Sequence, residues 1–369
     1  MIIKSLRLHH FRNYLDEEVN FPQSIIILYG RNGQGKTNIL EALYLGGMGK
    51  SYRGIVDSDL IHFQCEDASI IISFLRNNVE QQIKIILSKI DKKKLWVNET
   101  KVTQRELVGT LNEVLFSPED LQLVKGSPAL RRHFMDMEIS QVNPSYYRTL
   151  VKYNRAVAQR NLLLKSIKSV KKSVLEGWDL QISEFSAFIV KKRLEALHKI
   201  GFLSGIIHRR LTENQEKLDL SYDQSYFLIS QDTMQDRVSS AWYYKLLREK
   251  LDHDIYHMST SVGPHRDDLS FFINGYNIKK YGSQGQQRTA ALSLKLSELE
   301  YIKSEVGEYP ILLLDDVMSE LDEFRRKSLL NFVRNRIQTV ITTTDPDMFR
   351  SIEGCSFICL EGGRVKSYG

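Results

Sequence analysis

The sequence predicts an α/β protein in which one domain is built from both ends of the chain and a helical domain is inserted between them. Three observations support this prediction. A glycine-rich loop at residues 30–37 separates an apolar strand from a helical pattern, residues 118–257 show long helical patterns with few glycines, and strands and helices alternate after residue 258. We therefore expect an α/β domain from residues 1–117 and 258–369 and an all-helical domain from residues 118–257.

Apolar runs, the first residues and the cysteines argue against a membrane protein, a secreted protein and a zinc protein. The longest apolar runs, such as Ile25–Leu28 and Ile311–Leu314, are far shorter than the ~20 residues that a membrane-spanning helix needs. The first residues, MIIKSLRLHHF, lack the apolar stretch and the cleavage site of a signal peptide. The three cysteines have neither the number of a disulfide framework nor the spacing of a zinc site. We expect a cytoplasmic protein with no membrane partner.

Residues 1–117 read mostly as strands. The segments IIKSLRLHHF, SIIISFL, QQIKIILSKI and KLWVNETKV predict antiparallel pairs around one parallel core strand, IIILY at residues 25–29. A helix is expected from Asn38 to Leu45, directly after the glycine-rich loop.

The rest of the chain has clear element signals. Within residues 118–257, two segments are each long enough for helices of five turns or more. Asn274-Gly275 between two apolar runs predicts a hairpin. The strand PILLLDD, a helix near Glu320–Asn335, the strand QTVITTT and a hairpin around Gly362-Gly363 follow.

The loop LYGRNGQGKTN contains the full G-x-x-x-x-G-K-[ST] pattern of a phosphate-binding loop. Its glycines let the backbone wrap around a polyphosphate, and the N–H groups at the helix start face the anion. Lys36 is expected to reach the β and γ phosphates and the Thr37 hydroxyl to hold Mg²⁺. The predicted nucleotide-binding residues here are Gly30, Asn32, Gly33, Gly35, Lys36, Thr37 and Asn38. The alternative is a glycine turn beside an exposed lysine.

The strand ILLLDD supplies the carboxylates that such a site requires. Asp315 at the strand end is predicted to bind Mg²⁺ directly or through a water, and Asp316 to orient the attacking water. Lys36 and Asp316 are therefore the predicted catalytic residues. A buried strand followed by two acidic turn residues is also a common structural pattern.

The stretch SQGQQR at residues 283–288 opens a helix with uncharged polar groups. The order of phosphate loop, long insertion, Ser/Gly/Gln signature, acidic strand and SELD is typical of ABC-type ATPases. In that class the signature caps the γ-phosphate of an ATP held by the other subunit of a head-to-tail dimer. Ser283, Gly285 and Gln286 are then predicted to act in trans. The alternative is that Ser283 only caps its own helix.

Six motifs then resemble the RecF family of bacterial DNA repair proteins, in family order. They are LHHFRNY at 8–14, GRNGQGKTNILEAL at 30–43, FSPEDLQLVKGSPALRRHFMD at 116–136, GPHRDDL at 263–269, GSQGQQR at 282–288 and LLLDDVMSELD at 312–322. The resemblance implies an SMC-like ABC ATPase head, with a mixed sheet and an antiparallel β subdomain. It implies ATP and Mg²⁺ as cofactors, an ATP-dependent homodimer, and binding to double-stranded DNA and to junctions of single- and double-stranded DNA. It also implies work with RecO and RecR in loading RecA.

The resemblance assigns further residues position by position. Arg12-Asn13 matches the segment that approaches the nucleotide, Ser319 and Asp322 match the loop after the acidic strand, and Thr343 or Thr344 stands where many ABC proteins have a switch histidine. Many ABC proteins have Asp-Glu where this chain has Asp315-Asp316. Because aspartate is one methylene shorter, we expect slow hydrolysis, with ATP serving mainly as a dimer clamp. With the DNA binding that the resemblance implies, the expected activity is that of a weak DNA-dependent ATPase.

Basic residues mark candidate DNA contacts. The formal net charge is +6, and the stretch from Arg148 to Arg193 is strongly basic. The predicted contacts are Arg131, Arg132, Lys152, Arg155, Lys168, Lys171 and Lys172. The alternative for the lysines is a solvated helix face. Tyrosines such as Tyr146 and Tyr153 could stack on bases, but packing against a neighbouring helix is the favoured interpretation. The motif GPHRDDL could suggest a metal site, but a hydrogen-bonded turn is the favoured interpretation.

Two other functions fit a phosphate loop. A transport ATPase subunit would need a membrane-domain partner, and DNA-stimulated turnover would argue against it. A phosphotransferase acting as a single chain would show turnover independent of protein concentration, whereas a trans signature requires dependence on it.

Overall fold

The computed structural model describes residues 1–166, 172–224, 238–350, 352 and 354–368. It forms two compact units, Met1–Gln122 with Ala291–Gly369, and Leu123–Ala290. The α/β class and the inserted helical region are confirmed. The boundaries differ from the expected residues 117/118 and 257/258, most of all at the second boundary, because residues 268–277 pair with a strand inside the insertion.

The first unit contains a mixed sheet with the order β15-β14-β3-β13-β12-β8. Its strands are β3 (Ile25–Tyr29), β8 (Glu113–Phe116), β12 (Ile311–Asp315), β13 (Thr339–Thr343), β14 (Cys355–Glu361) and β15 (Arg364–Tyr368). All neighbouring pairs are parallel except β14 with β15. Both faces of β12 and β13 are buried, which explains their continuous apolar or small side chains. The carboxyl ends of β3, β12 and β13 meet at one edge.

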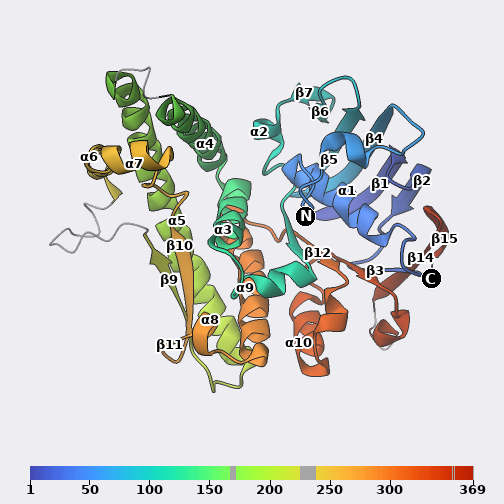
Figure 1. Ribbon diagram of the computed structural model, residues 1–369. Coiled ribbons are helices and arrows are strands. Elements are labelled where there is room, and N and C mark those ends of the chain that lie inside the picture. Colours follow the sequence, from blue (N-terminus) through green and yellow to red (C-terminus); the bar gives the residue numbers. More distant parts are fainter. Residues whose placement is uncertain (167–171, 225–237, 351, 353, 369) are drawn as a thin grey trace. The chain divides into compact units, whose positions relative to one another are not determined.

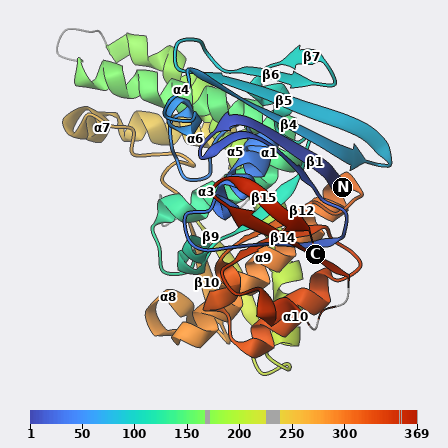
Figure 2. The ribbon, with the colours of Figure 1, turned by 90° about the vertical axis from the view of Figure 1, so that its right-hand side faces the viewer.

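A second sheet in this unit is wholly antiparallel, with the order β2-β1-β4-β5-β6-β7. Its strands are β1 (Ile2–Phe11), β2 (Tyr14–Asn20), β4 (Asp67–Arg76), β5 (Val79–Ser88), β6 (Lys94–Val97) and β7 (Thr100–Val102). Figure 2 shows β1, β4 and β5 as long neighbouring strands. IIILY is a parallel core strand, as expected, but it lies in the other sheet and not among these antiparallel pairs. A strand buried on both faces pairs in the parallel sheet, whereas the alternating strands bury only one face.

Helices complete the first unit. Helix α1 (Lys36–Met48) is longer than the expected Asn38–Leu45 and packs against strands of both sheets. The other helical segments are η1 (Asp57–Leu60), α2 (Gln104–Leu107), η2 (Pro118–Gln122), the main part of α9 (Gln284–Val306), η6 (Val317–Glu320), α10 (Glu323–Val333) and η7 (Pro346–Phe349). In the described ranges, no helix has both the length and the apolar character needed to cross a membrane.

The second unit is built around one long helix. Helix α5 (Glu176–Leu211) runs along α4 (Pro144–Lys165) and α6 (Ser240–Glu249), as Figure 1 shows. The unit also contains α3 (Pro128–Val142), η4 (Lys172–Leu175), α7 (Leu251–His257), α8 (Ile278–Tyr281) and the first turns of α9. The insertion is not all-helical, because β9 (Leu218–Asp223) pairs with β10 (Asp268–Ile273), which pairs with β11 (Tyr276–Asn277).

Buried ion pairs form part of the core of this second unit. The Arg160 guanidinium lies 2.6 Å from both the Asp179 and the Asp254 carboxylates, and all three side chains are fully buried. Arg193 is 2% exposed and pairs with Asp136 at 2.9 Å. Arg160 and Arg193, which belong to the basic stretch, are therefore core residues. Their ion pairs supply the partner that each buried charge needs.

Candidate nucleotide-binding site

The glycine-rich loop connects β3 to α1. Gly30 and Gly35 have φ of +149° and +108°. A Cβ atom at Gly30 would lie 2.4 Å from the Leu360 carbonyl oxygen, and one at Gly35 would lie 2.6 Å from the Tyr14 hydroxyl. Both positions therefore require glycine, and Tyr14 further supports the loop by donating to the Gly35 carbonyl at 3.0 Å.

Lys36 lies across this loop. Its ammonium group donates to the carbonyl oxygens of Gly30 at 2.6 Å and Arg31 at 2.9 Å. Burial lowers the pKa of Lys36, and the nearby Asp316 and Asp315 carboxylates oppose that effect. A phosphate oxygen entering the loop can replace the two carbonyls as the partner of this ammonium group.

Asp315 at the end of β12 meets Thr37 at the start of α1. The Thr37 hydroxyl donates to Asp315 Oδ1 at 2.9 Å, and the Thr342 hydroxyl donates to the same oxygen at 3.0 Å. The Tyr52 hydroxyl donates to Asp315 Oδ2 at 2.7 Å. The structure thus brings together the two residues that the sequence predicts as Mg²⁺ ligands, although 278 positions separate them.

The donor set at this point suits an ion that is shared with phosphate. Mg²⁺ is commonly bound by one or two protein oxygens together with phosphates and waters. Thr37 and Asp315 provide one hydroxyl and one carboxylate. Across the part of the chain that the structure describes, no group of three or more His, Cys, Asp or Glu side chains could hold a metal ion. The hydroxyl of Thr37 and the carboxylate of Asp315 fit Mg²⁺ delivered with a nucleotide.

Asp316 has an unusual backbone conformation. Its φ of +53° lies in the left-handed region, and its N–H donates to the Thr342 hydroxyl at 2.9 Å. The Ser319 hydroxyl donates to the Asp316 carbonyl at 2.7 Å, which stabilises the turn. Desolvation, and then repulsion from Asp315, raise the pKa of Asp316 above its usual value. A higher pKa makes this carboxylate a better proton acceptor.

Arg12 and Asn13 differ in how they relate to the loop. The Asn13 side-chain amide donates to the Gln34 carbonyl at 3.2 Å and accepts from Asn38 at 2.8 Å, so it contacts the loop directly. The Arg12 guanidinium instead makes two hydrogen bonds, of 2.9 and 3.0 Å, to the fully buried Glu41. Asn32 and Gly33 are exposed at the loop tip.

The signature residues lie in the second unit, at the start of α9. The Gln286 N–H donates to the Ser283 hydroxyl at 3.2 Å, and the Ser283 N–H donates to Gln286 Oε1 at 2.9 Å. Ser283 therefore caps its own helix, as the simpler interpretation expects. Because its hydroxyl oxygen only accepts in this cap, its proton can still be donated to a phosphate. The first turn, which includes Gly285, contains no acidic residue.

The remaining residues predicted for the nucleotide site lie close to β12 and β13 in sequence. Asp322 is the N-cap of α10 and accepts from the Arg325 N–H at 2.9 Å. Thr343 is buried, and its hydroxyl bonds to the backbone of Asp345. Thr344 is exposed, so it is the candidate switch residue that presents its side chain to solvent.

The predicted DNA contacts divide into buried and exposed residues. Arg131 is 1% exposed and forms a bidentate ion pair with Asp268, at 2.7 and 2.8 Å, so the prediction that it contacts DNA was wrong. Arg132 is partly exposed and donates to the Asp267 carbonyl at 2.7 Å. Lys152 and Arg155 are exposed on α4. Lys168 and Lys171 lie outside the described residues, and Lys172 begins η4.

Two predictions for the inserted region are confirmed: tyrosines that pack within the unit, and a hydrogen-bonded turn at GPHRDDL. Tyr146, Tyr153 and Tyr243 are at most 2% exposed, so they pack within the unit. In GPHRDDL, the Arg266 N–H donates to the Gly263 carbonyl at 2.9 Å, which closes a turn.

Sequence reasoning missed three residues that support the site. Tyr52 and Thr342 bind the Asp315 carboxylate, and Glu41 binds Arg12. Thr342 could have been found, because it lies near the carboxyl end of β13, a strand that lies parallel to β12. Tyr52 carries no such signal, because only the folding of the segment after α1 brings it to Asp315.

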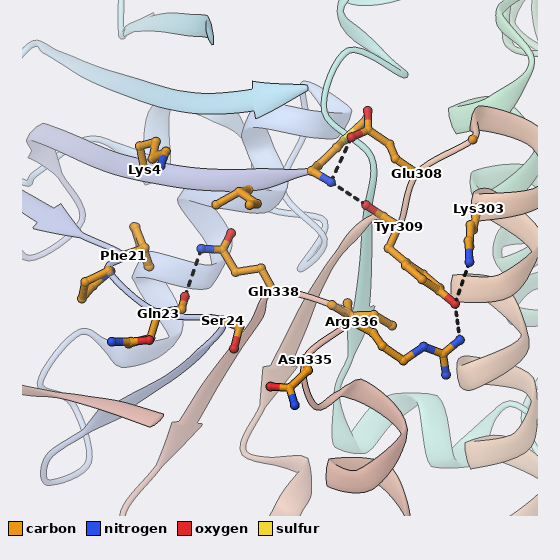
Figure 3. A pocket seen from close by; sticks show the side chains of 15 residues that line it. Lys4, Phe21, Gln23, Ser24, Lys303, Glu308, Tyr309, Asn335, Arg336 and Gln338 are labelled. Carbon is orange, nitrogen blue, oxygen red and sulfur yellow. Dashed lines mark hydrogen bonds and ion pairs between the residues drawn. The ribbon is translucent and has the colours of Figure 1, made fainter. Parts of the chain in front are cut away.

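A cavity of about 670 Å³ in the first unit lies at the opposite edge of the parallel sheet (Figure 3). It is lined by residues that precede β3 and β13, including Gln23, Ser24 and Gln338. Figure 3 shows Lys303 and Arg336 converging on the Tyr309 hydroxyl. Ligands of α/β sheets usually bind at the carboxyl ends of the strands, so this cavity is not the nucleotide site.

The chain matches known proteins over nearly its whole length. A family model described as the RecF/RecN/SMC N terminal domain matches residues 2–366. The chain is 42% identical to the DNA replication and repair protein RecF of Clostridium beijerinckii over 343 residues, which are 93% of this chain and 91% of the relative. It is 43% identical to the DNA replication and repair protein RecF of Halothermothrix orenii over 349 residues, which are 94% of this chain and 92% of the relative.

Solved structures give the same similarity. A structure described as the recombination mediator protein RecF-ATPrS in the RecFOR pathway matches with a TM-score of 0.90 and 36% identity, covering 99% of this chain and 97% of that chain. A RecF-ATP structure matches with a TM-score of 0.90 and 35% identity, over the same shares of the two chains. The Smc head domain of Pyrococcus furiosus matches with a TM-score of 0.56 and 18% identity over 100% and 96%, which shows a shared fold.

Proposed function

This chain belongs to the RecF family, and from that premise we propose that it is an ATP-dependent DNA-binding protein of recombinational repair that closes as an ATP-driven dimer clamp. The single observation that supports this best is the hydrogen bond between Thr37 and Asp315. It joins the phosphate loop to the acidic strand in the arrangement that a Mg²⁺–ATP site needs.

Each residue of the site has a chemical role in this proposal. The loop N–H groups and Lys36 bind the β and γ phosphates, and Thr37 with Asp315 would hold Mg²⁺, which when bound neutralises phosphate charge. Asp316 orients the attacking water and accepts its proton at a carboxylate oxygen. Its raised pKa favours that role, while its short side chain is the reason to expect that the hydrolysis that resets the clamp is slow. We propose that DNA stimulates this hydrolysis.

The signature completes the site in trans. In the ATP-bound homodimer, Ser283 donates its free hydroxyl proton to the γ-phosphate held by the other subunit, and the α9 N-terminus with Gly285 adds favourable backbone N–H groups. We propose that Thr344 and the loop from Ser319 to Asp322 face the γ-phosphate that is hydrolysed. The hydrogen-bonding geometry at Ser283 supports this role, because the cap uses only its oxygen.

The proposed DNA targets and partners follow from the family. We infer that the clamp binds double-stranded DNA at gaps and at single- and double-strand junctions, and that it acts with RecO and RecR to help load RecA. The solved relatives described as part of the RecFOR pathway support these partners. The 42% identity to a DNA replication and repair protein argues against the transport and phosphotransferase alternatives. A cytoplasmic location stays a prediction.

Sedimentation of three proteins tests the clamp. Parent, Ser283→Arg and the control Ser304→Arg, an exposed serine near the other end of α9, are sedimented with gapped duplex DNA, with and without ATP and Mg²⁺. We expect ATP to convert the parent and the control to DNA-bound dimers, while Ser283→Arg binds nucleotide but stays monomeric. If all three stay monomeric with normal ATP turnover, the helix start serves its own subunit and the clamp is wrong.

A further inference from the structure

The hydroxyl of Tyr52 contacts the carboxylate that is expected to bind Mg²⁺. Tyr52 Oη lies 2.7 Å from Asp315 Oδ2, and Asp315 Oδ1 is used by Thr37 and Thr342. Each of the two carboxylate oxygens therefore has its own donors. Tyr52 supplies the hydrogen bond to Oδ2, whereas the phosphate-loop hydroxyl of Thr37 bonds to Oδ1.

Tyr52 is itself held on two sides. Its ring packs edge-to-face against Tyr44 of α1, with centroids 5.4 Å apart and an interplanar angle of 72°. The preceding residue, Ser51, is buried and donates to Glu41 at 2.5 Å. Glu41 also receives two hydrogen bonds from Arg12. The segment after α1 is thus tied to the helix that begins with the phosphate loop.

An aspartate carboxylate needs such support to keep one orientation. The χ2 torsion of aspartate is broad and roughly two-fold, so rotation exchanges the two oxygens at little cost when only one of them is bonded. With a donor on each oxygen, rotation breaks hydrogen bonds that are partly shielded from water. The Tyr52 bond therefore keeps Oδ1 beside Thr37, where the ion would be shared.

We propose that Tyr52 is a positioning residue, which orients the Asp315 carboxylate for Mg²⁺ through the hydrogen bond to Oδ2. Tyr52 acts through Asp315 and needs no contact with nucleotide or metal. The hydrogen bonds from Arg12 through Glu41 and Ser51 extend this support to the end of β1. This inference rests on the proposed ATP site and adds the residue that sets its metal affinity.

The test measures how nucleotide affinity depends on Mg²⁺. A fluorescent ATP analogue is titrated into the full-length parent and Tyr52→Phe, first in EDTA and then over a range of Mg²⁺ concentrations. We expect equal affinities in EDTA, because the loop and Lys36 are unchanged. In Mg²⁺ the variant should need about 10-fold more ion to reach half of its tightening, since loss of a group that orients a metal ligand typically costs 10–100-fold in metal affinity.

Two further variants control for packing and folding. Tyr44→Phe removes a hydroxyl from the other ring of the pair while keeping the edge-to-face contact, and it should keep the Mg²⁺ dependence of the parent. Ser51→Ala leaves Tyr52 intact but removes the bond to Glu41, so it should raise the Mg²⁺ requirement by a smaller factor. Ser51→Ala also carries the test if thermal unfolding shows that Tyr52→Phe is misfolded.

A second readout reports the ion itself. Mn²⁺ replaces Mg²⁺, and electron paramagnetic resonance counts the Mn²⁺ bound in the presence of ATPγS. Lower Mn²⁺ occupancy in Tyr52→Phe at matched nucleotide occupancy would support the proposal. Unchanged Mg²⁺ and Mn²⁺ dependence in both Tyr52→Phe and Ser51→Ala, or tighter binding, would overturn it. If the nucleotide affinity of the parent protein does not change with Mg²⁺ concentration, the result would instead contradict the proposed ATP site.

Discussion

Asp316 in the candidate site combines a strained backbone conformation with repulsion from a neighbouring carboxylate. Asp316 is a non-glycine residue in the left-handed region, where L-residues are less stable by about 1–2 kcal/mol. The same turn places its carboxylate next to Asp315, which contributes to its raised pKa. Strained residues of this kind persist where the surrounding structure holds them, and here Thr342 and Ser319 do so. We therefore expect substitution of Asp316 to have a large effect on the proposed hydrolysis.

Asp316→Asn tests the catalytic role. The amide keeps the shape of the side chain but cannot accept a proton, so we expect ATP hydrolysis to fall at least about 100-fold. The variant should still dimerise with ATP and hold DNA, but it should fail to release it. Steady-state phosphate release and DNA dissociation after ATP withdrawal measure these effects.

Asp91→Asn, an exposed aspartate in the loop before β6, is the control for that substitution. It should hydrolyse ATP at the parent rate. Turnover by Asp316→Asn within a few-fold of the parent would assign the water-orienting role to another residue.

At the scale of elements, the turn between α7 and β10 is held by buried polar contacts. His265 Nε2–H donates to the Thr260 carbonyl at 3.1 Å, and Nδ1 accepts from the Tyr153 hydroxyl. This arrangement fits the neutral ring. Burial lowers the pKa of His265 from 6.5 to about 4, and the nearby Arg266, Arg132 and Arg193 charges add to the effect. The GPHRDDL motif is therefore linked to α4 through the hydrogen bond with Tyr153.

The pH dependence of stability follows from His265. Between pH 6.5 and about 4, the unfolded chain binds a proton at this residue that the folded chain does not, so stability falls as the pH falls through this window. From pH 7 to pH 5 the loss is at most about 2 kcal/mol. Urea denaturation of parent and His265→Gln at the two pH values measures it.

The exposed His198 on α5 offers a matched control. His198→Gln should keep the acid sensitivity of the parent, whereas His265→Gln should lose that part of it, because glutamine does not titrate. Equal losses of stability in all three proteins would mean that His265 does not control the pH response.

At the scale of the whole molecule, the buried arginines change where positive charge is available to DNA. Arg131, Arg160 and Arg193 are enclosed in ion pairs within the second unit, so they contribute to its folding. Lys152 and Arg155, three positions apart on α4, remain exposed. An exposed basic helix face contacts phosphates without reading sequence, and each contact releases counterions.

Reversing these two charges tests the DNA surface. For Lys152→Glu with Arg155→Glu, we expect weaker binding to all duplex sequences and a slope of log K against log salt that is smaller by about 2. Fluorescence anisotropy across salt concentrations measures both. The double variant Lys92→Glu with Lys101→Glu has the same net charge on exposed residues of the first unit and should keep the parent slope. If both double variants give the same slope, α4 does not contact DNA.

The sequence by itself determined the family, the α/β class and the residues of the phosphate loop and the acidic strand. These follow from short-range patterns: glycines at positions that only glycine can adopt, apolar strands, and helix starts. The partners of those residues were decided only by the tertiary structure. Strand order brings Thr342 to Asp315, and the segment after α1 brings Tyr52 there.

The same distinction explains the errors. Charge along a sequence does not reveal burial, so Arg131 looked available for DNA until Asp268 was seen to pair with it across 137 positions. Likewise β9 and β10, which form a sheet, are separated by α6 and α7, so neither strand alone indicated that the insertion contains a sheet. Local conformation is encoded locally, whereas ion pairs and strand pairing depend on contacts that form only when distant segments meet.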